Sequence, residues 1–167
     1  MARSSSWGEL TYRPLAAPWG PSLEIFRFAG AWSPPIEQID SGWGVWDGER
    51  FSGALVAERS GPTAMLHGPV VVGPPDAAPV SVIEVAAELL AAALRHAEAS
   101  AIDTVFTRPH GLDGIWVRHG FIPVPEVELP KALRGRPGVG LFGWRGGSAL
   151  WSAARRGTPP RRSARSA

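Results

Sequence analysis

The sequence predicts one mixed α/β (α+β) domain, with a mostly antiparallel central sheet of about seven strands flanked by helices. Three observations support this fold class. Residues 43–72 form three consecutive strand-like segments, a long amphipathic helix begins at Ser81, and further short strand-like segments lie on both sides of this region. A chain of 167 residues suits a single domain with a sizeable core.

Composition excludes several classes of protein. The chain has no cysteine, so disulfide frameworks, thiol nucleophiles and cysteine-ligated zinc sites are ruled out. The first residues lack the apolar stretch of a secretory signal, and no segment approaches the roughly 18 apolar residues of a membrane span. We therefore expect a soluble, cytoplasmic protein that makes no membrane contact.

The net charge of +2 comes from the end of the chain. Residues 151–167 carry five arginines and no acid, whereas residues 1–150 carry twelve basic and fifteen acidic residues, a net charge of −3. This composition predicts a single domain over residues 1–150, followed by a disordered Arg-rich tail over residues 151–167. The alternative for the tail is a basic arm for nucleic acid or anionic lipid. Nucleic acid is not expected as a partner elsewhere on the chain.

The first forty residues contain one clear strand and one ambiguous segment. Leu10–Leu15 predicts a strand, because apolar and polar side chains alternate along it until prolines end the pattern. Pro21–Trp32 fits a strand by composition and a short helix by position. The Ser33-Pro34-Pro35 segment resembles the entry to a short helix over Ile36–Ile39.

The next region predicts a meander of three antiparallel strands. These strands are Trp43–Trp46, Phe51–Glu58 and Ala64–Val72, joined by turns at Asp47-Gly48 and Ser60-Gly61-Pro62. The last strand ends in three consecutive valines, which suits a central position in the sheet.

The segment after Ser81 predicts the longest helix. Ser81-Val82-Ile83-Glu84 has the spacing of a capping box, so the helix is expected to begin at Ser81. A narrow polar stripe opposes a broad apolar face, which indicates a mostly buried helix. The apolar face consists of Val82, Ala86, Leu89, Leu90 and Ala93.

The remaining elements are short. Thr104–Thr107 predicts a strand, and Leu112–His119 predicts a helix closed by Gly120. Two last strands are expected at Val124–Leu129 and Val139–Trp144, separated by a loop rich in proline, arginine and glycine.

The order of these elements and the stretch Trp116-Val117-Arg118-His119-Gly120-Phe121-Ile122-Pro123 resemble the GNAT superfamily of acyl-CoA-dependent N-acetyltransferases. The resemblance extends over roughly residues 8–145. It rests on a valine-rich strand leading through a loop into the long helix, and on an aromatic residue four positions before Gly-Phe. It implies a GNAT-like fold and acyl transfer to a primary amine.

The resemblance also implies a site for acetyl-CoA. In the family, the strand before the loop pairs with the pantetheine arm, which here assigns Val70, Val71 and Val72 to the donor. The loop and the helix N-terminus hold the pyrophosphate, because free N–H groups and the positive end of the helix dipole bind anions. Aligning the helix on Leu89-Leu90 adds four positions to this site: Ser81, Val82, Ile83 and Ala86.

The phosphate-binding positions depart from the family pattern Gln/Arg-x-x-Gly-x-Gly/Ala. Ala86 matches its final small residue, but Glu84 stands where the first glycine belongs. The loop prolines, Pro74, Pro75 and Pro79, remove three amide donors. We therefore expect a poor pyrophosphate cradle.

The resemblance implies two catalytic positions. Many members use a tyrosine four residues before Gly-Phe as the acid for the leaving thiolate. Here that residue is Trp116, whose indole N–H cannot donate a proton usefully near neutral pH. His67 is the candidate general base, with a hydrogen-bonded structural histidine as the alternative. Glu58 is either a base or a charge at the edge of the sheet, and the edge charge is favoured.

Two functions of different classes follow. The first is an acyl-CoA-dependent N-acyltransferase that moves an acetyl group to a small-molecule or peptide amine and positions its reactants without a side-chain acid. The second is a GNAT-like binding or regulatory module that no longer binds CoA, which Glu84, the loop prolines and Trp116 favour. No metal site is predicted, since the histidines lack ligand spacing. A homodimer remains a possible state of assembly.

Overall fold

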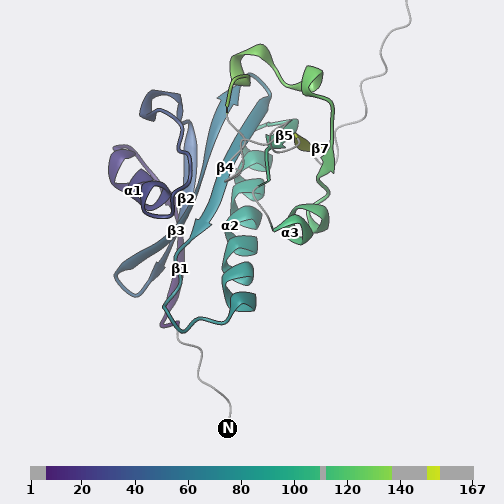
Figure 1. The fold of residues 1–167 in the computed structure, drawn as a ribbon. Helices are drawn as coiled ribbons and strands as arrows, with labels where there is room; N and C mark the ends of the chain where they lie inside the picture. The colour runs from purple at the N-terminus through teal and green to yellow at the C-terminus, as the bar shows by residue number, and fades with distance from the viewer. Residues whose placement is uncertain (1–6, 110–111, 137–149, 155–167) are drawn as a thin grey trace, which may run out of the picture.

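The structure is a computed structural model that describes residues 7–109, 112–136 and 150–154. Its strands are β1 Leu10–Leu15, β2 Ser41–Asp47, β3 Arg50–Ser60, β4 Thr63–Val71, β5 Thr104–Thr107, β6 Ile122–Pro123 and β7 Trp151–Ala154. Its α-helices are α1 Gly20–Phe28, α2 Pro79–Ala99 and α3 Asp113–Arg118 (Figure 1). Short 3₁₀ turns are η1 Ile36–Gln38, η2 Glu126–Glu128 and η3 Lys131–Leu133.

One seven-stranded sheet organises the molecule. Its strand order is β1-β2-β3-β4-β5-β7-β6, and β4 with β5 is the parallel pair in an otherwise antiparallel ladder. Seven strands and mostly antiparallel pairing confirm the fold class predicted from the sequence. The ambiguous segment before residue 32 is the helix α1.

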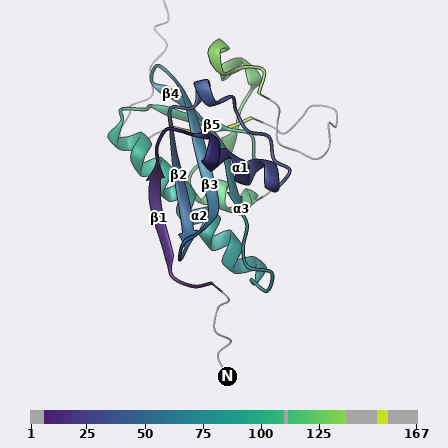
Figure 2. The ribbon, with the colours of Figure 1, turned by 90° about the vertical axis from the view of Figure 1, so that its left-hand side faces the viewer.

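The two faces of the sheet are covered by different helices. Helix α2 lies along one face and α1 packs on the other, as Figures 1 and 2 show. The alternation along β3 explains this arrangement, because successive side chains of a strand point to opposite faces. Leu55 and Ala57 belong to the core under α2, whereas Ala54 and Val56 belong to the core under α1.

Helix α2 presents most of its predicted apolar face to the sheet. Ala86, Leu89, Leu90 and Ala93 are buried there, and Val82 is half-buried. Among the residues that the structure describes, no helix is both long and apolar enough to cross a membrane.

The predicted capping box at the start of α2 is wrong. The helix begins two residues earlier at Pro79, and the N-cap residue Ala78 makes no side-chain cap bond. Proline suits the first helical position because its missing N–H would have no helical partner there. Ser81 therefore lies inside the first turn, where its hydroxyl donates to the Ala78 carbonyl oxygen at 2.6 Å.

A third apolar cluster covers the part of the sheet that α1 leaves open. It lies on the side of β4 and β5 opposite α2, under the two turns η2 and η3. Its buried members are Met65, Phe106, Leu129, Leu133 and Leu150. The face opposite α2 therefore has two apolar regions, one under α1 and one under η2 and η3.

The C-terminal elements differ from the sequence prediction. The strand expected over Val124–Leu129 is wrong, since β6 spans only Ile122–Pro123 and the turn η2 follows Pro125. Prolines that lack an N–H interrupt any ladder there. The tail predicted from residue 151 is also wrong at its start, because Trp151–Ala154 forms β7 between β5 and β6. Residues 139–144 and 155–167 lie outside the described residues.

Strand β4 contains a bulge in the middle of the sheet. Ala54 pairs with Val70 and Val56 pairs with His67, so Gly68 and Pro69 together oppose the single residue between them on β3. Gly68 has a φ of +100°, and an added Cβ would lie 3.0 Å from the Ala54 carbonyl oxygen. Both facts require glycine at this position.

Gly68→Ala is expected to lower the free energy of unfolding by about 2–3 kcal/mol, from backbone strain plus the clash with β3. The matched control is Gly48→Ala, because Gly48 has a φ of +61° with no atom within 4 Å of an added Cβ. That variant carries strain without a clash and should lose about 1 kcal/mol. Urea unfolding of both variants makes the comparison, and equal losses would contradict a tightly packed bulge.

Candidate functional site

The candidate site is built around Glu58, a carboxylate on the sheet face opposite α2. Glu58 is 2% exposed, so the predicted edge charge is wrong: the residue lies near the end of β3 and is covered by other side chains. Burying an ionised carboxylate is costly unless partners satisfy its oxygens. Glu58 has two such partners.

The first partner is His67 on β4. Its Nε2 lies 2.7 Å from Glu58 Oε2, and its side chain is 5% exposed. The hairpin register brings the two residues together, since Glu58 pairs with Met65 and the next residue on the same face of β4 is His67.

The second partner is Arg136, which follows η3. Its Nη2 donates to Glu58 Oε1 at 2.6 Å, and its Nε donates to Oε2 at 3.0 Å. The same guanidinium donates to two backbone carbonyl oxygens, those of Ala132 and Arg134, so it is anchored to its own segment. Such a forked contact is the strongest way for a side chain to hold a carboxylate.

These contacts set the charge of the site. Burial alone would raise the pKa of Glu58, but the hydrogen bonds and charges of His67 and Arg136 outweigh it and lower the pKa from 4.5 to about 2. Glu58 is therefore ionised at neutral pH and can only accept hydrogen bonds. It follows that His67 Nε2 carries the hydrogen in this contact, so Nδ1 is the ring nitrogen that is not engaged with Glu58.

The cluster lies where the sheet opens. The parallel ladder between β4 and β5 ends at the pair Leu66 and Thr107, so His67 is the first β4 residue beyond it. Trp32, from the segment after α1, packs edge-on against the His67 ring with 5.1 Å between ring centroids. The imidazole is thus held on one side by Glu58 and Arg136 and is covered on another by an indole.

Beyond the bulge lie the predicted donor residues Val70, Val71 and Val72, where the edge of β4 away from β3 has no strand partner among the described residues. The Val72 N–H donates to the Ser52 carbonyl oxygen on β3 at 2.7 Å. Because N–H groups of a strand point alternately to its two edges, the Val71 N–H points away from β3, toward the side where β5 has diverged. A thioester arm lying along this edge would meet a strand N–H, so this part of the site fits an acyl-pantetheine group.

The helix residues predicted to hold the donor have different surroundings. Ala86 is 1% exposed and faces the sheet, so it is packed in the core. Ile83 is exposed, Val82 is half-buried, and the Ser81 hydroxyl is engaged with Ala78 and Trp7. The structure therefore leaves the first turn of α2 with few groups for a ligand.

Trp116 lies in the core on the α2 side. Its side chain is 1% exposed and packs at right angles against Phe121, with 4.9 Å between ring centroids. The structure does not bring it together with His67, which points to the opposite face of the sheet.

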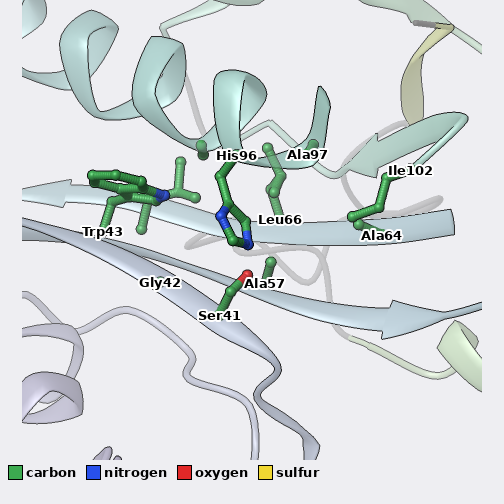
Figure 3. A pocket seen from close by; sticks show the side chains of 11 residues that line it. Ser41, Gly42, Trp43, Ala57, Ala64, Leu66, His96, Ala97 and Ile102 are labelled. Carbon is green, nitrogen blue, oxygen red and sulfur yellow. The ribbon is translucent and has the colours of Figure 1, made fainter. Parts of the chain in front are cut away.

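Two cavities lie on the α2 side. Figure 3 shows the smaller one, about 10 Å³, beneath α2 beside Trp43, His96 and Ser41. Its size suits at most one water molecule. The larger, about 480 Å³, lies between the second half of α2 and the end of α3. Within residues 7–109, 112–136 and 150–154, no three acids or histidines gather as metal ligands.

Sequence reasoning missed Arg136 and the pairing of Glu58 with His67. The pairing had a local signal, because the turn after Ser60 sets the register that places the two residues diagonally on one face. Arg136 had none, since it is 78 positions from Glu58 and reaches it only through the fold.

Comparisons with known proteins agree on the fold. No protein-family model matches the sequence, and no curated protein does. Among solved structures, an acetyltransferase of the GNAT family from Staphylococcus aureus Mu50 superposes with a TM-score of 0.63 at 10% identity, over 87% of this chain and 99% of that one. The ribosomal-protein-S18-alanine N-acetyltransferase from Escherichia coli gives 0.61 at 12% identity, over 87% and 94%.

A third similar structure was solved with ligands. N-acetylglutamate synthase from Neisseria gonorrhoeae, complexed with coenzyme A and N-acetyl-glutamate, has a TM-score of 0.63 at 13% identity, over 88% of this chain and 35% of that one. Together these structures show that the chain has the GNAT fold, as the sequence resemblance implied.

Acid pH should remove the contribution of Glu58 to stability. A carboxyl whose pKa is lowered by folding stabilises the protein above its unfolded pKa of 4.5, and this contribution disappears as the pH falls through about 2. We expect Glu58→Gln to cost about 3 kcal/mol of unfolding free energy at pH 5 and to cost little at pH 2. Urea unfolding of both proteins across this range measures the difference, and a constant difference would contradict an ionised buried Glu58.

Proposed function

We propose that this protein is an N-acyltransferase that moves an acyl group from an acyl-CoA-type thioester to an amine. The observation that carries the proposal is the Glu58–His67 pair on the face opposite α2, directly where β4 leaves β5. A carboxylate that holds an imidazole in one tautomer is a recurrent way to make histidine a base.

The chain's own groups suit each part of this reaction. The acceptor ammonium loses a proton to His67 Nδ1, directly or through a water molecule, and the freed amine attacks the thioester carbonyl. The N–C bond forms and the C–S bond breaks. The second proton lost by the nitrogen goes to the sulfur, directly or through a water molecule, so the leaving group departs as the thiol. Glu58 stabilises the imidazolium, and the Val71 N–H at the open strand edge is suited to polarising the carbonyl oxygen.

The roles of the other groups follow from their places. Arg136 keeps Glu58 ionised and fixed, so it is a positioning residue. Trp116 is packed in the core, which supports a reaction that proceeds without a side-chain acid, by positioning the amine and thioester. The fold of acetyltransferases in the comparison structures supports the same reaction class.

His67→Asn should lower kcat/KM for acetyl transfer by about 100-fold or more, since a positioned base contributes a factor of that order. His119→Gln is the matched control, because His119 lies at the end of α3, where its Nδ1 meets the Ile115 carbonyl oxygen. Steady-state rates with a panel of primary amines give the comparison. An unchanged kcat/KM in His67→Asn, or an equal loss in His119→Gln, would contradict the role of His67.

Binding of the acyl donor is the direct test of the reaction class. Acetyl-CoA at about 100 times its dissociation constant should raise the free energy of unfolding by roughly 2.7 kcal/mol. Thermal unfolding with increasing acetyl-CoA, up to millimolar concentration, measures this gain. If neither acetyl-CoA nor S-acetyl-pantetheine raises the free energy of unfolding, acyl transfer is contradicted. The alternative, a GNAT-like binding module that no longer binds an acyl donor, is then favoured.

A further inference from the structure

The junction between β4 and α2, residues 72–82, provides few backbone donors for an anion. Pro74, Pro75 and Pro79 have no N–H. The Ala77 N–H donates to the Pro74 carbonyl oxygen at 2.9 Å, and the N–H groups of Ser81 and Val82 both donate to that of Ala78. Most amides that a phosphate would require are therefore missing or already bonded within the junction.

The N-terminal segment also covers this junction. Trp7 is 8% exposed, and its indole Nε1 donates to Ser81 Oγ at 2.9 Å. The Trp7 ring packs against Gly73 so closely that a Cβ added there would lie 2.9 Å from Trp7 Cζ2. The glycine that precedes the loop prolines thus makes room for an indole of the protein itself.

The charges of the junction oppose a phosphate as well. Asp76 and Glu84 are both exposed on the loop and the second turn of α2, and the sequence has no lysine or arginine from Ser60 to Leu94. Arg50 reaches the junction from the start of β3, but its Nη2 donates to the carbonyl oxygens of Val72 and Gly73. Anions near such acids are repelled rather than attracted.

The strand edge of the same site has the opposite character. The Val71 N–H is directed away from β3, to an edge that has no strand partner beyond Leu66 within residues 7–109, 112–136 and 150–154. This edge suits the neutral amides of a pantetheine arm, which pair as a strand does. The β4 edge at Val71 therefore suits the pantetheine arm of a donor, whereas the junction of residues 72–82 does not suit its pyrophosphate.

We propose that the donor is recognised through its acyl-pantetheine arm alone, so the protein accepts acyl-pantetheine thioesters without a nucleotide about as well as acyl-CoA. This inference rests on the proposed acyl transfer and names its donor class. The bonds made and broken are the same: the amine takes the acyl carbon, and pantetheine leaves as the free thiol.

The test compares S-acetyl-pantetheine with acetyl-CoA on the full chain. We expect kcat/KM values within about threefold of each other. Calorimetric titration with non-reactive thioether analogues of the two donors gives a readout besides activity, with dissociation constants also within about threefold. The affinity for the CoA analogue should not fall between 50 and 300 mM NaCl, because salt screens the repulsion by the two acids and there is no attractive phosphate contact for it to weaken.

Two outcomes would overturn the inference in distinguishable ways. If the CoA analogue binds at least 100-fold more tightly than the pantetheine analogue, the nucleotide is recognised; acyl transfer then stands and the donor class proposed here is wrong. If neither analogue binds at millimolar concentration, the proposed function itself fails.

A charge variant tests the same inference without loss of function. The double variant Asp76→Asn with Glu84→Gln removes the two acids, and it should bind the CoA analogue about threefold more tightly while its affinity for the pantetheine analogue stays unchanged. Glu37→Gln, an exposed acid in η1, is the matched control and should alter neither affinity. Equal gains for both analogues, or none, would contradict repulsion at the junction.

Discussion

Strand β4 pairs with β3 on one edge and with β5 on the other, over different lengths, and the position of the candidate site depends on this difference. It pairs with β3 through most of its length, but its parallel ladder with β5 ends at Leu66. The bulge at Gly68 allows both, because one extra residue re-aims the strand without breaking the hairpin. The backbone of β4 after Leu66 therefore sets three features: the direction of the His67 side chain, the strand edge without a described partner, and the path of the chain toward α2.

The buried carboxylate of Glu58 is the second constraint. Removing such a charge from water is expensive, and only partners with good geometry offset the cost. His67 and Arg136 supply them from β4 and from the segment after η3. Glu58 therefore lies between the two apolar regions on the face opposite α2, the one under α1 and the one under η2 and η3. Its contacts link the elements that cover these regions. The same contacts hold the imidazole in one orientation.

The chemistry at His67 differs from the chemistry at the junction between β4 and α2. At His67 an imidazole and the ionised carboxylate of Glu58 are buried beside an indole. At the junction with α2, prolines and Trp7 complete the packing of the core instead of leaving amides for a ligand. The N–H groups that take part in this packing are not free to bind an anion as well.

Periodicity and turn chemistry along the chain predicted β1, the three-stranded meander, α2 with its buried face, β5 and α3, because these features depend on neighbours a few residues away. They also placed His67 and the valines at the end of β4. Local patterns misjudged Glu58 and Trp151–Ala154, whose partners lie far along the chain. They also placed the start of α2 two residues late, because Pro79 takes the first helical position. What the sequence by itself determined is therefore the order of elements and the candidate base, whereas only the tertiary structure decided which charges meet, since burial and ion pairing depend on side chains that the fold brings together.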